Sequence, residues 1–319
     1  MRMLALLASV VVMASTAQAS TNVSIDVGGG AKRTARAVRS AVTERGLDGT
    51  VWLGKLRGVG GGRDTLVYVP NVIDTTRTID VVIYMEGIGS FDDEAMKTRH
   101  VASFARMRGN FVYVAPDAPS STLGTRDSKN EYWKAGCAER ACAGGHAAPG
   151  DFVVFLDETR TKIAATLGVD RAALDLRVSL VGFSRGGRGA QRAVEQLAAV
   201  KFEVGGMRVK LGDVVFADGN YRDDGLEVTW GILAGRPEAP RLTILVGAGE
   251  FTLKEDGDGN RRRALMFWKR AARGAELPTA DRAVSAPRMR LVPLRGGHHA
   301  IGNAAVDFLT HTEPTAHTT

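Results

Sequence analysis

Short runs rich in valine, isoleucine and leucine alternate along this chain with longer stretches that have the period of a helix. This alternation predicts an α/β protein with a mostly parallel central sheet and helices on both faces. Strands that are buried on both faces are apolar throughout, as most of these runs are. The predicted strands are Thr65–Val69, Asp80–Met85, Asn110–Ala115, Arg177–Val181, Asp213–Ala217, Leu242–Val246 and Met289–Leu294.

Helical spacing fills several of the intervals between these runs. Asp151 has the side chain of an N-cap, and the apolar residues after it keep helical spacing until Gly168. A second predicted helix follows Ser184, and two more cover about Asp92–Met107 and Arg261–Ala272. Residues 30–50 are predicted to form a basic amphipathic helix and a turn before the sheet begins.

The first 19 residues have the pattern of a signal peptide. Arg2 supplies positive charge, Leu4–Val12 forms an apolar core, and Ala17-Gln18-Ala19 is a small-residue cleavage site. The apolar core is shorter than the roughly 20 residues of a membrane span. We therefore expect a secreted or periplasmic protein without stable membrane insertion. Residues 20–309 are expected to form a single domain, followed by a disordered Thr-rich tail over residues 310–319.

Composition and charge narrow the class of protein further. Of the 319 residues, 44% are hydrophobic and 24% are charged, which excludes a disordered chain and a coiled-coil rod. The 42 Lys and Arg against 35 Asp and Glu give a net charge of +7, scattered along the chain. Solubility, a cell-surface partner or an acidic substrate explains this charge as well as nucleic acid does, and we expect no nucleic-acid partner. The oligomeric state stays open.

The two cysteines, Cys137 and Cys142, lie in a run of small and polar residues. In an oxidising compartment they are expected to form a disulfide that closes one short loop. Zinc is the alternative, with His146 nearby, but a fourth ligand and the usual Cys-x-x-Cys spacing are missing. No metal site is therefore predicted.

The segment Gly182-Phe183-Ser184-Arg185-Gly186 contains the motif Gly-x-Ser-x-Gly between a predicted strand and a predicted helix. In that setting the serine stands on a sharp, strained turn, and bulky neighbours would collide with the strand and the helix. The N-terminus of the helix beside it also favours an anion. Ser184 is therefore the candidate nucleophile, and an ordinary turn with an incidental serine is the alternative.

A serine nucleophile needs a base, and the base needs an acid to orient it. His298 and His299 follow the last predicted strand, where binding residues gather in open α/β sheets, and His298 is the preferred base. Glu250 follows the penultimate strand and would give the chain order Ser, Glu, His. Asp218, at the end of the strand before that one, is the alternative acid.

Two backbone N–H groups are needed to bind the negative charge that develops on the reacting carbonyl oxygen. One is expected from Arg185, the residue after the nucleophile. The other is expected from Ile88, because the glycines beside it let the backbone of the loop Glu86–Ser90 approach a substrate closely.

With these motifs the chain resembles the α/β-hydrolase fold, and within it secreted esterases similar to poly(3-hydroxybutyrate) depolymerases and feruloyl esterases. The resemblance covers about residues 64–310. Its segments are Leu66–Pro70, Gly87–Gly89, Ala115–Asp117, Tyr132-Trp133, Gly182–Gly187, Gly247–Glu250 and Gly296–His298. It implies a serine hydrolase that cleaves small-molecule or polymeric carboxylic esters without a cofactor.

Three residues depart from the pattern of that family. Glu86 stands where histidine is usual before the oxyanion glycine, Arg185 replaces a small or apolar residue, and Glu250 replaces aspartate. These departures leave the substrate class open. Serine peptidases share the fold and the order of the triad, and a catalytically silent binding protein would keep the fold as well, so both stay as alternatives.

Overall fold

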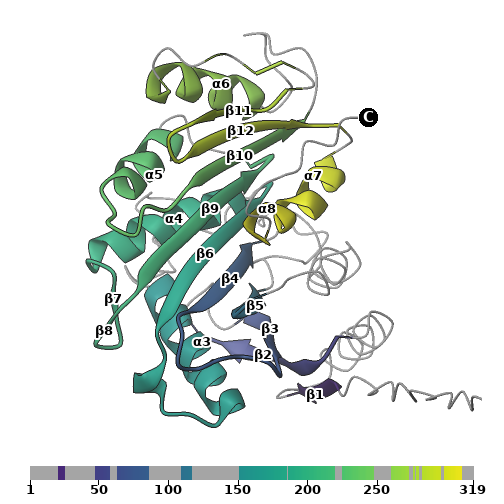
Figure 1. Ribbon diagram of the computed structural model, residues 1–319, viewed down its shortest axis with the longest axis vertical. Coiled ribbons are helices and arrows are strands. Elements are labelled where there is room, and N and C mark those ends of the chain that lie inside the picture. The colour runs from purple at the N-terminus through teal and green to yellow at the C-terminus, as the bar shows by residue number, and fades with distance from the viewer. Residues whose placement is uncertain are drawn as a thin grey trace, which may run out of the picture.

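The computed structural model describes residues 21–25, 47–57, 63–85, 109–116, 151–184, 186–219, 225–247, 260–272, 276, 278–279, 282–295 and 298–310. Within these ranges the chain forms a twisted sheet of ten strands, and Figure 1 shows it running from β1 at one end to β11 and β12 at the other. The strand order is β1-β2-β3-β5-β4-β6-β9-β10-β12-β11.

Most neighbouring strands of this sheet run parallel. The exceptions are β3, which is antiparallel to β2 and to β5, and β11, which is antiparallel to β12. A separate hairpin consists of β7 and β8. The strands are β1 (Thr21–Ile25), β2 (Gly49–Leu56), β3 (Arg63–Pro70), β4 (Ile79–Met85), β5 (Phe111–Pro116), β6 (Leu176–Phe183), β7 (Glu203–Val204), β8 (Met207–Arg208), β9 (Lys210–Ala217), β10 (Leu242–Gly247), β11 (Val284–Ala286) and β12 (Met289–Leu294).

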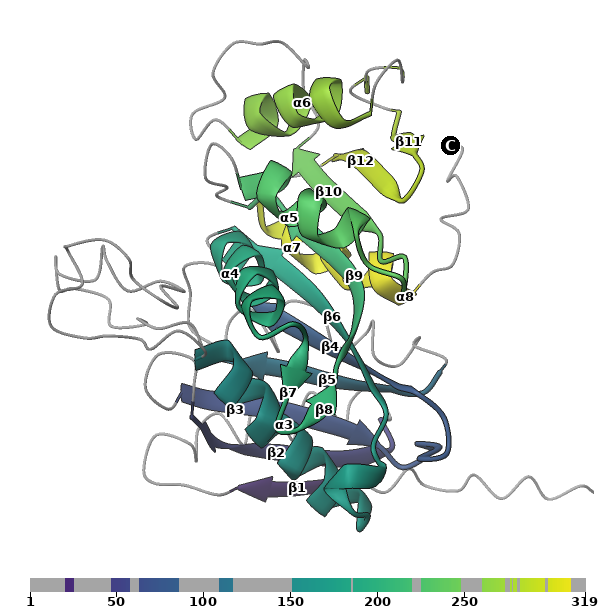
Figure 2. The same ribbon diagram turned by 90° about the vertical axis from the view of Figure 1, so that its left-hand side faces the viewer.

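Helices cover both faces of the sheet, as predicted. On one face lie α3 (Asp151–Leu167), α4 (Gly186–Ala199), α5 (Gly225–Ala234) and α6 (Asn260–Ala271), and on the other lie α7 (His298–Ala305) and α8 (Asp307–Thr310). A short 3-10 helix, η4, spans Arg171–Ala173. Figures 1 and 2 show α3 to α5 on the side opposite α7 and α8.

All seven predicted strands are present, because strands buried on both faces carry a strong apolar signal. The prediction for residues 30–50 is wrong at its end. Gly49 and Thr50 already belong to β2, and β1 starts the sheet at Thr21, so the sheet begins before the place predicted. The predicted helix over Asp92–Met107 lies outside the described residues.

The C-terminal end of the chain differs from its prediction in two places. His298 was expected in a loop after the last strand, but it is the first residue of α7. Thr310, expected to begin the disordered tail, ends α8. Ile301 and Ala305 of α7 are fully buried against the sheet, and this burial stabilises a helix whose short sequence carries a weak helical signal.

The helices on the face covered by α3 to α6 pack through apolar residues. In α4, Ala190, Val194 and Leu197 recur with helical spacing and are fully buried. In α6, Trp268 is fully buried and its indole N–H donates a hydrogen bond of 3.0 Å to the carbonyl oxygen of Glu276. The tryptophan therefore contributes both apolar contact and a satisfied polar group to this side of the core.

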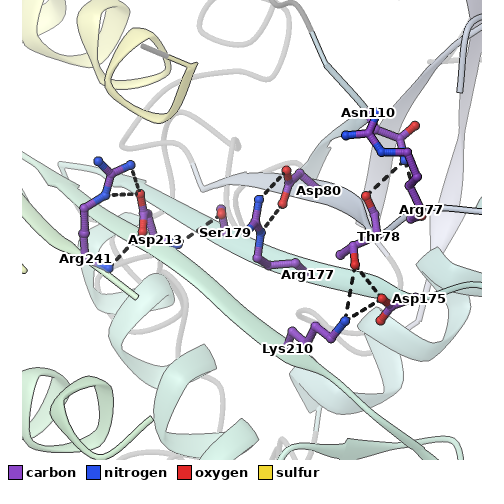
Figure 3. Close-up of polar contacts among 10 residues, drawn as sticks. All are labelled: Arg77, Thr78, Asp80, Asn110, Asp175, Arg177, Ser179, Lys210, Asp213 and Arg241. Carbon is purple, nitrogen blue, oxygen red and sulfur yellow. Dashed lines mark hydrogen bonds and ion pairs between the residues drawn. The ribbon is translucent and has the colours of Figure 1, made fainter. Parts of the chain in front are cut away.

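The N-terminal ends of the central strands carry a row of ion pairs (Figure 3). Arg177 of β6 donates to both carboxylate oxygens of Asp80 in β4, from Nε to Oδ1 and from Nη2 to Oδ2, the latter at 2.7 Å. Arg241, just before β10, donates through Nε and Nη2 to a single oxygen of Asp213 in β9, Oδ2, at 2.8 and 2.6 Å. Ser179 lies between the two pairs and accepts a hydrogen bond from the backbone N–H of Asp213.

A third interaction in this row shows how its charges depend on pH. Burial alone would raise the pKa of Asp175, but hydrogen bonds from Lys210 and Thr78 outweigh that effect and hold this pKa below its ordinary value. A carboxyl whose pKa is lowered by folding stabilises the folded state above its ordinary pKa. That stabilisation is lost as the pH falls through the lowered pKa of the folded state.

The buried indole of Trp268 gives a direct test of the core between the sheet and helices α3 to α6. Replacing Trp268 with alanine is expected to lower the free energy of unfolding by about 3–5 kcal/mol, because a cavity replaces the ring. Met266 lies on the same helix but is 38% exposed, so Met266→Ala should change this free energy by less than about 0.5 kcal/mol. Urea unfolding of the two variants measures the difference, and equal losses would contradict the packing described here.

Candidate active site

Ser184 stands on a sharp turn between β6 and α4. Its φ of 52° is in the left-handed region, which few residues other than glycine adopt. The turn closes through a hydrogen bond of 3.1 Å from the backbone N–H of Gly187 to the carbonyl oxygen of Ser184. The strained backbone and the immediate start of α4 agree with the strand–turn–helix setting that the motif requires.

Two glycines make this turn sterically feasible. A Cβ at Gly182 would lie 2.7 Å from the carbonyl oxygen of Gly186 and 2.7 Å from Cα of Gly187. A Cβ at Gly187 would lie 3.0 Å from Cα of Gly219, which follows β9. The strand, the turn and the neighbouring strand end are therefore packed backbone against backbone, and any side chain here would push them apart.

The ends of β6 and β9 lie side by side, and this brings the nucleophile next to an acid. Phe183 pairs with Ala217 in the parallel register, and the N–H of Ser184 donates to the carbonyl oxygen of Ala217 at 2.9 Å. Asp218 follows Ala217 directly and, like Ser184, has a positive φ, 46°. Its own N–H donates to the carbonyl oxygen of Leu245 in β10, at 2.8 Å. The register of β6 and β9 therefore places Asp218 at the strand end next to Ser184.

His298, the first residue of α7, reaches Asp218 from the face of the sheet opposite α4. Its Nδ1 lies 2.5 Å from Oδ2 of Asp218, and the two side chains are 39% and 19% exposed. An ionised carboxylate accepts hydrogen bonds only, so the imidazole places its proton on Nδ1. In the neutral ring the lone pair is then on Nε2, which is the form that can accept a proton from a hydroxyl group.

The imidazole of His298 also rests on an aromatic ring. The ring centroids of His298 and Phe183 are 4.6 Å apart, with 35° between the ring planes. Phe183 is buried and immediately precedes Ser184. The same residue therefore ends the strand that carries the nucleophile and supports one side of the histidine.

The N-terminus of α6 holds the strand ends from the other side. The side-chain amide of Asn260, which is buried, donates to the carbonyl oxygen of Asp218 at 3.3 Å. Arg261 donates through Nε to the carbonyl oxygen of Gly247 at 3.2 Å. These bonds fix the backbone at the ends of β9 and β10, and a strained residue such as Asp218 persists only where its surroundings hold it in place.

The structure brings together some of the predicted site residues. Ser184 and Asp218 follow the neighbouring C-terminal ends of β6 and β9, and His298 is in contact with Asp218, the alternative acid. His299 is the second residue of α7. The remaining predicted residues lie outside the described residues: Glu250, Arg185, Ile88, Cys137 and Cys142.

Two supporting residues were not identified from the sequence: Phe183 and Asn260. Phe183 occupies the variable second position of the serine motif, so its identity carried no signal. Asn260 directly precedes the predicted helix Arg261–Ala272, and an asparagine in that position is a recognisable cap signal.

A cavity among the described residues lies away from this site. That cavity, about 390 Å³, is lined by residues of the ion-pair row, among them Asp80, Arg177 and Arg241. Ser179, also in its wall, is five residues before Ser184, or about 16 Å along an extended strand. The described part of the chain holds no group of three or more potential metal-ligating side chains and no helix long and apolar enough to cross a membrane.

The crowding at Gly182 predicts a position-specific effect on stability. Gly182→Ala should lower the free energy of unfolding by about 1–3 kcal/mol, because the atoms that Cβ would meet are backbone atoms and cannot rotate away. Gly247 is a matched control at the end of β10, where Cβ would be 3.7 Å from its nearest neighbours and Gly247→Ala should cost less than about 0.5 kcal/mol. Urea unfolding distinguishes the two, and an unchanged Gly182→Ala protein would refute the tight turn.

Comparison with known proteins gives structural similarity only. No protein-family model and no curated protein matches the sequence. The BES protein from Bacillus cereus is 10% identical, with a TM-score of 0.49 over 82% of this chain and 96% of that one. LpqC, a poly(3-hydroxybutyrate) depolymerase from Bordetella parapertussis, is 16% identical, with a TM-score of 0.41 over 77% of this chain and 83% of that one. A ferulic acid esterase from Anaeromyces mucronatus is 15% identical, with a TM-score of 0.41 over 82% and 90% of the two chains.

The order and direction of the strands identify the fold. Counted along the chain from β2, leaving out the β7–β8 hairpin and the edge strand β11, eight neighbouring strands follow the order 1-2-4-3-5-6-7-8, and the second is antiparallel to the others. The sharp serine turn follows the fifth of them, β6, and the histidine follows the eighth, β12. With this order and this placement of the turn, the chain has the α/β-hydrolase fold.

Proposed function

We propose that this protein is a serine hydrolase that cleaves carboxylic esters, with Ser184 as nucleophile, His298 as general base and Asp218 as the acid that orients it. The observation that carries the proposal is the 2.5 Å contact between His298 Nδ1 and Asp218 Oδ2, made beside the strained turn at Ser184. A nucleophile, a base and an orienting carboxylate at one end of a sheet are the parts that acyl transfer requires.

In the first half of the proposed reaction, Nε2 of His298 takes the proton of the Ser184 hydroxyl while Oγ attacks the ester carbonyl carbon. The tetrahedral intermediate carries its negative charge on the former carbonyl oxygen, and Asp218 stabilises the imidazolium. The bond to the leaving alcohol oxygen then breaks, and that oxygen receives the proton from Nε2. The products of this half are a free alcohol and an acyl group bound to Ser184.

Water completes the reaction. His298 removes a proton from a water molecule, whose oxygen attacks the acyl carbon, and the bond to Ser184 Oγ breaks as Oγ regains a proton from the imidazolium. The net reaction converts one ester and one water into a carboxylic acid and an alcohol. These steps are additions, eliminations and proton transfers, so the balance requires no electron donor or acceptor.

The negative charge of the intermediate needs donors of its own. We propose the backbone N–H groups of Arg185 and Ile88 for this role. The position of residue 185 between Ser184 and the first residue of α4 supports the first donor, because a helix N-terminus stabilises negative charge. Residue 88 follows β4, the neighbour of β6 in the sheet, and this order supports the second.

The acid of the triad is proposed as Asp218 in place of Glu250. The short contact to His298 and the hydrogen bond from Asn260 to the backbone of Asp218 support this choice. We also propose that residues 1–19 direct export, and that Cys137 and Cys142 pair in the oxidising compartment that the protein then reaches.

A labelling experiment tests the activity. A fluorophosphonate probe should label the protein on Ser184, and Ser184→Ala should lose both the label and the hydrolysis of p-nitrophenyl esters while its unfolding curve is unchanged. In the parent protein kcat/KM should rise with pH through a histidine-like pKa of about 6.5, because only the neutral imidazole accepts the proton. A folded protein without label would indicate a silent binding protein, and faster cleavage of peptide amides than of esters would indicate a peptidase.

Two matched variants decide between the acids. Asp218→Asn should lower kcat by about 10⁴-fold, because an amide no longer fixes the tautomer of His298 or stabilises its positive charge. Glu250→Gln should change kcat by less than about tenfold. Steady-state kinetics with one p-nitrophenyl ester measures both, and a nearly inactive Glu250→Gln beside an active Asp218→Asn would move the acid to the end of β10.

A further inference from the structure

Helix α7 packs against the sheet through Gly302, which lies on the ring of Phe183. A Cβ at Gly302 would be 2.9 Å from both Cδ2 and Cε2 of the Phe183 ring, closer than side-chain carbons approach one another. Gly302 and Phe183 are both buried. The helix can lie this close to the ring only because residue 302 has no side chain.

The same ring is in contact with His298. Residues 298 and 302 are one helical turn apart and project from the same face of α7. The imidazole of His298 therefore covers one part of the Phe183 ring, with centroids 4.6 Å apart, while the bare backbone of Gly302 covers another. The depth of α7 on this ring sets how far the imidazole extends toward Asp218 and Ser184.

We propose that Gly302 is a positioning residue for the catalytic histidine. Its lack of a side chain lets α7 settle on Phe183 at the depth where Nδ1 of His298 meets Asp218 at 2.5 Å. This inference rests on the proposed function for its kinetic consequence, and on the packing alone for its structural one.

The size of the expected displacement follows from ordinary contact distances. Carbon atoms in contact are separated by about 3.5–4.0 Å, so a Cβ at position 302 must move the helix or the ring by about 0.6–1 Å. Phe183 is fixed within β6 by its backbone pairing with Ala217, so helix α7, which carries His298, is the part that moves. A shift of about 1 Å at a catalytic group can lower the rate by about 100-fold.

The test compares two glycine-to-alanine variants in helices. Gly302→Ala should lower kcat by about 10- to 100-fold and change KM by less than about twofold, because the base is displaced and the substrate contacts are not. Gly231 of α5 is the matched control: apart from its own helix, a Cβ there meets no atom within 4 Å among those described. Gly231→Ala should keep kcat and KM and should leave the unfolding midpoint unchanged or raise it.

A second variant separates steric displacement from general damage. Phe183→Leu shortens the side chain that Cβ of residue 302 would strike, so kcat of the double variant Phe183→Leu/Gly302→Ala should exceed that of Gly302→Ala by about tenfold. The single variant Phe183→Leu supplies the reference for this double-mutant cycle. A Gly302→Ala protein with the parent kcat, or a double variant that is no faster than Gly302→Ala, would overturn the proposal.

A spectroscopic readout keeps this proposal apart from the proposed function. The Nδ1 proton that His298 shares with a carboxylate should give a far-downfield proton resonance in the parent protein, and Asp218→Asn should remove it. Gly302→Ala should shift or broaden that resonance, and Gly231→Ala should leave it in place. If Ser184→Ala kept its esterase activity while this pattern held, the proposed function would fail and the positioning of His298 would stand. An unshifted, sharp resonance in Gly302→Ala would overturn the positioning proposal itself.

Discussion

The close backbone packing where β6 ends and α4 begins is the constraint on which the candidate site depends. Gly182 and Gly187 have no side chains, so the strand can turn into the helix within a few residues, and the start of α4 can lie against Gly219 beyond β9. Ser184 takes a positive φ as the cost of that turn. A methyl group at Gly182 would strike the turn itself, and one at Gly187 would push the start of α4 away from the strand end that carries the acid.

Parallel register then determines which carboxylate lies next to the serine. Because Phe183 pairs with Ala217, the residues that follow them, Ser184 and Asp218, emerge at neighbouring strand ends. Two side chains at the start of α6 hold the backbone at these strand ends. Asn260 donates to the carbonyl oxygen of Asp218, and Arg261 donates to that of Gly247. The acid is thus held from both sides, by β10 through its N–H and by α6 through its carbonyl oxygen.

The N-terminal and C-terminal ends of the strands carry different kinds of residues. The N-terminal ends of β4, β6 and β9 carry paired charges such as Arg177 with Asp80, which satisfy one another across neighbouring strands (Figure 3). The C-terminal ends carry strained backbone and a histidine that is brought from the opposite face by α7. In open α/β sheets, ligands bind outside the carboxyl ends of the strands, and the position of Ser184 follows that rule.

Much of this arrangement could be predicted from the sequence, because its signals are local. The seven apolar runs identified seven strands, and Gly182-x-Ser184 between a strand and a helix identified the sharp turn. The strands β1 and β2 were missed, since β2 (Gly49–Leu56) contains Gly54 and Lys55 within an otherwise apolar run and β1 is short and partly polar. Gly and Lys are depleted in strands, so only pairing with a neighbour reveals such a segment.

What the sequence determined by itself is the periodicity that specifies the α/β sheet and the short motif that specifies the serine turn. What only the tertiary structure decided is which acid meets His298 and what supports its ring. The sequence placed both Glu250 and Asp218 at strand ends and favoured Glu250, whereas strand order with register put Asp218 in contact with His298. Contacts of this kind join residues 80 or more positions apart, and no local pattern encodes them, because they arise only when separate elements pack against one another.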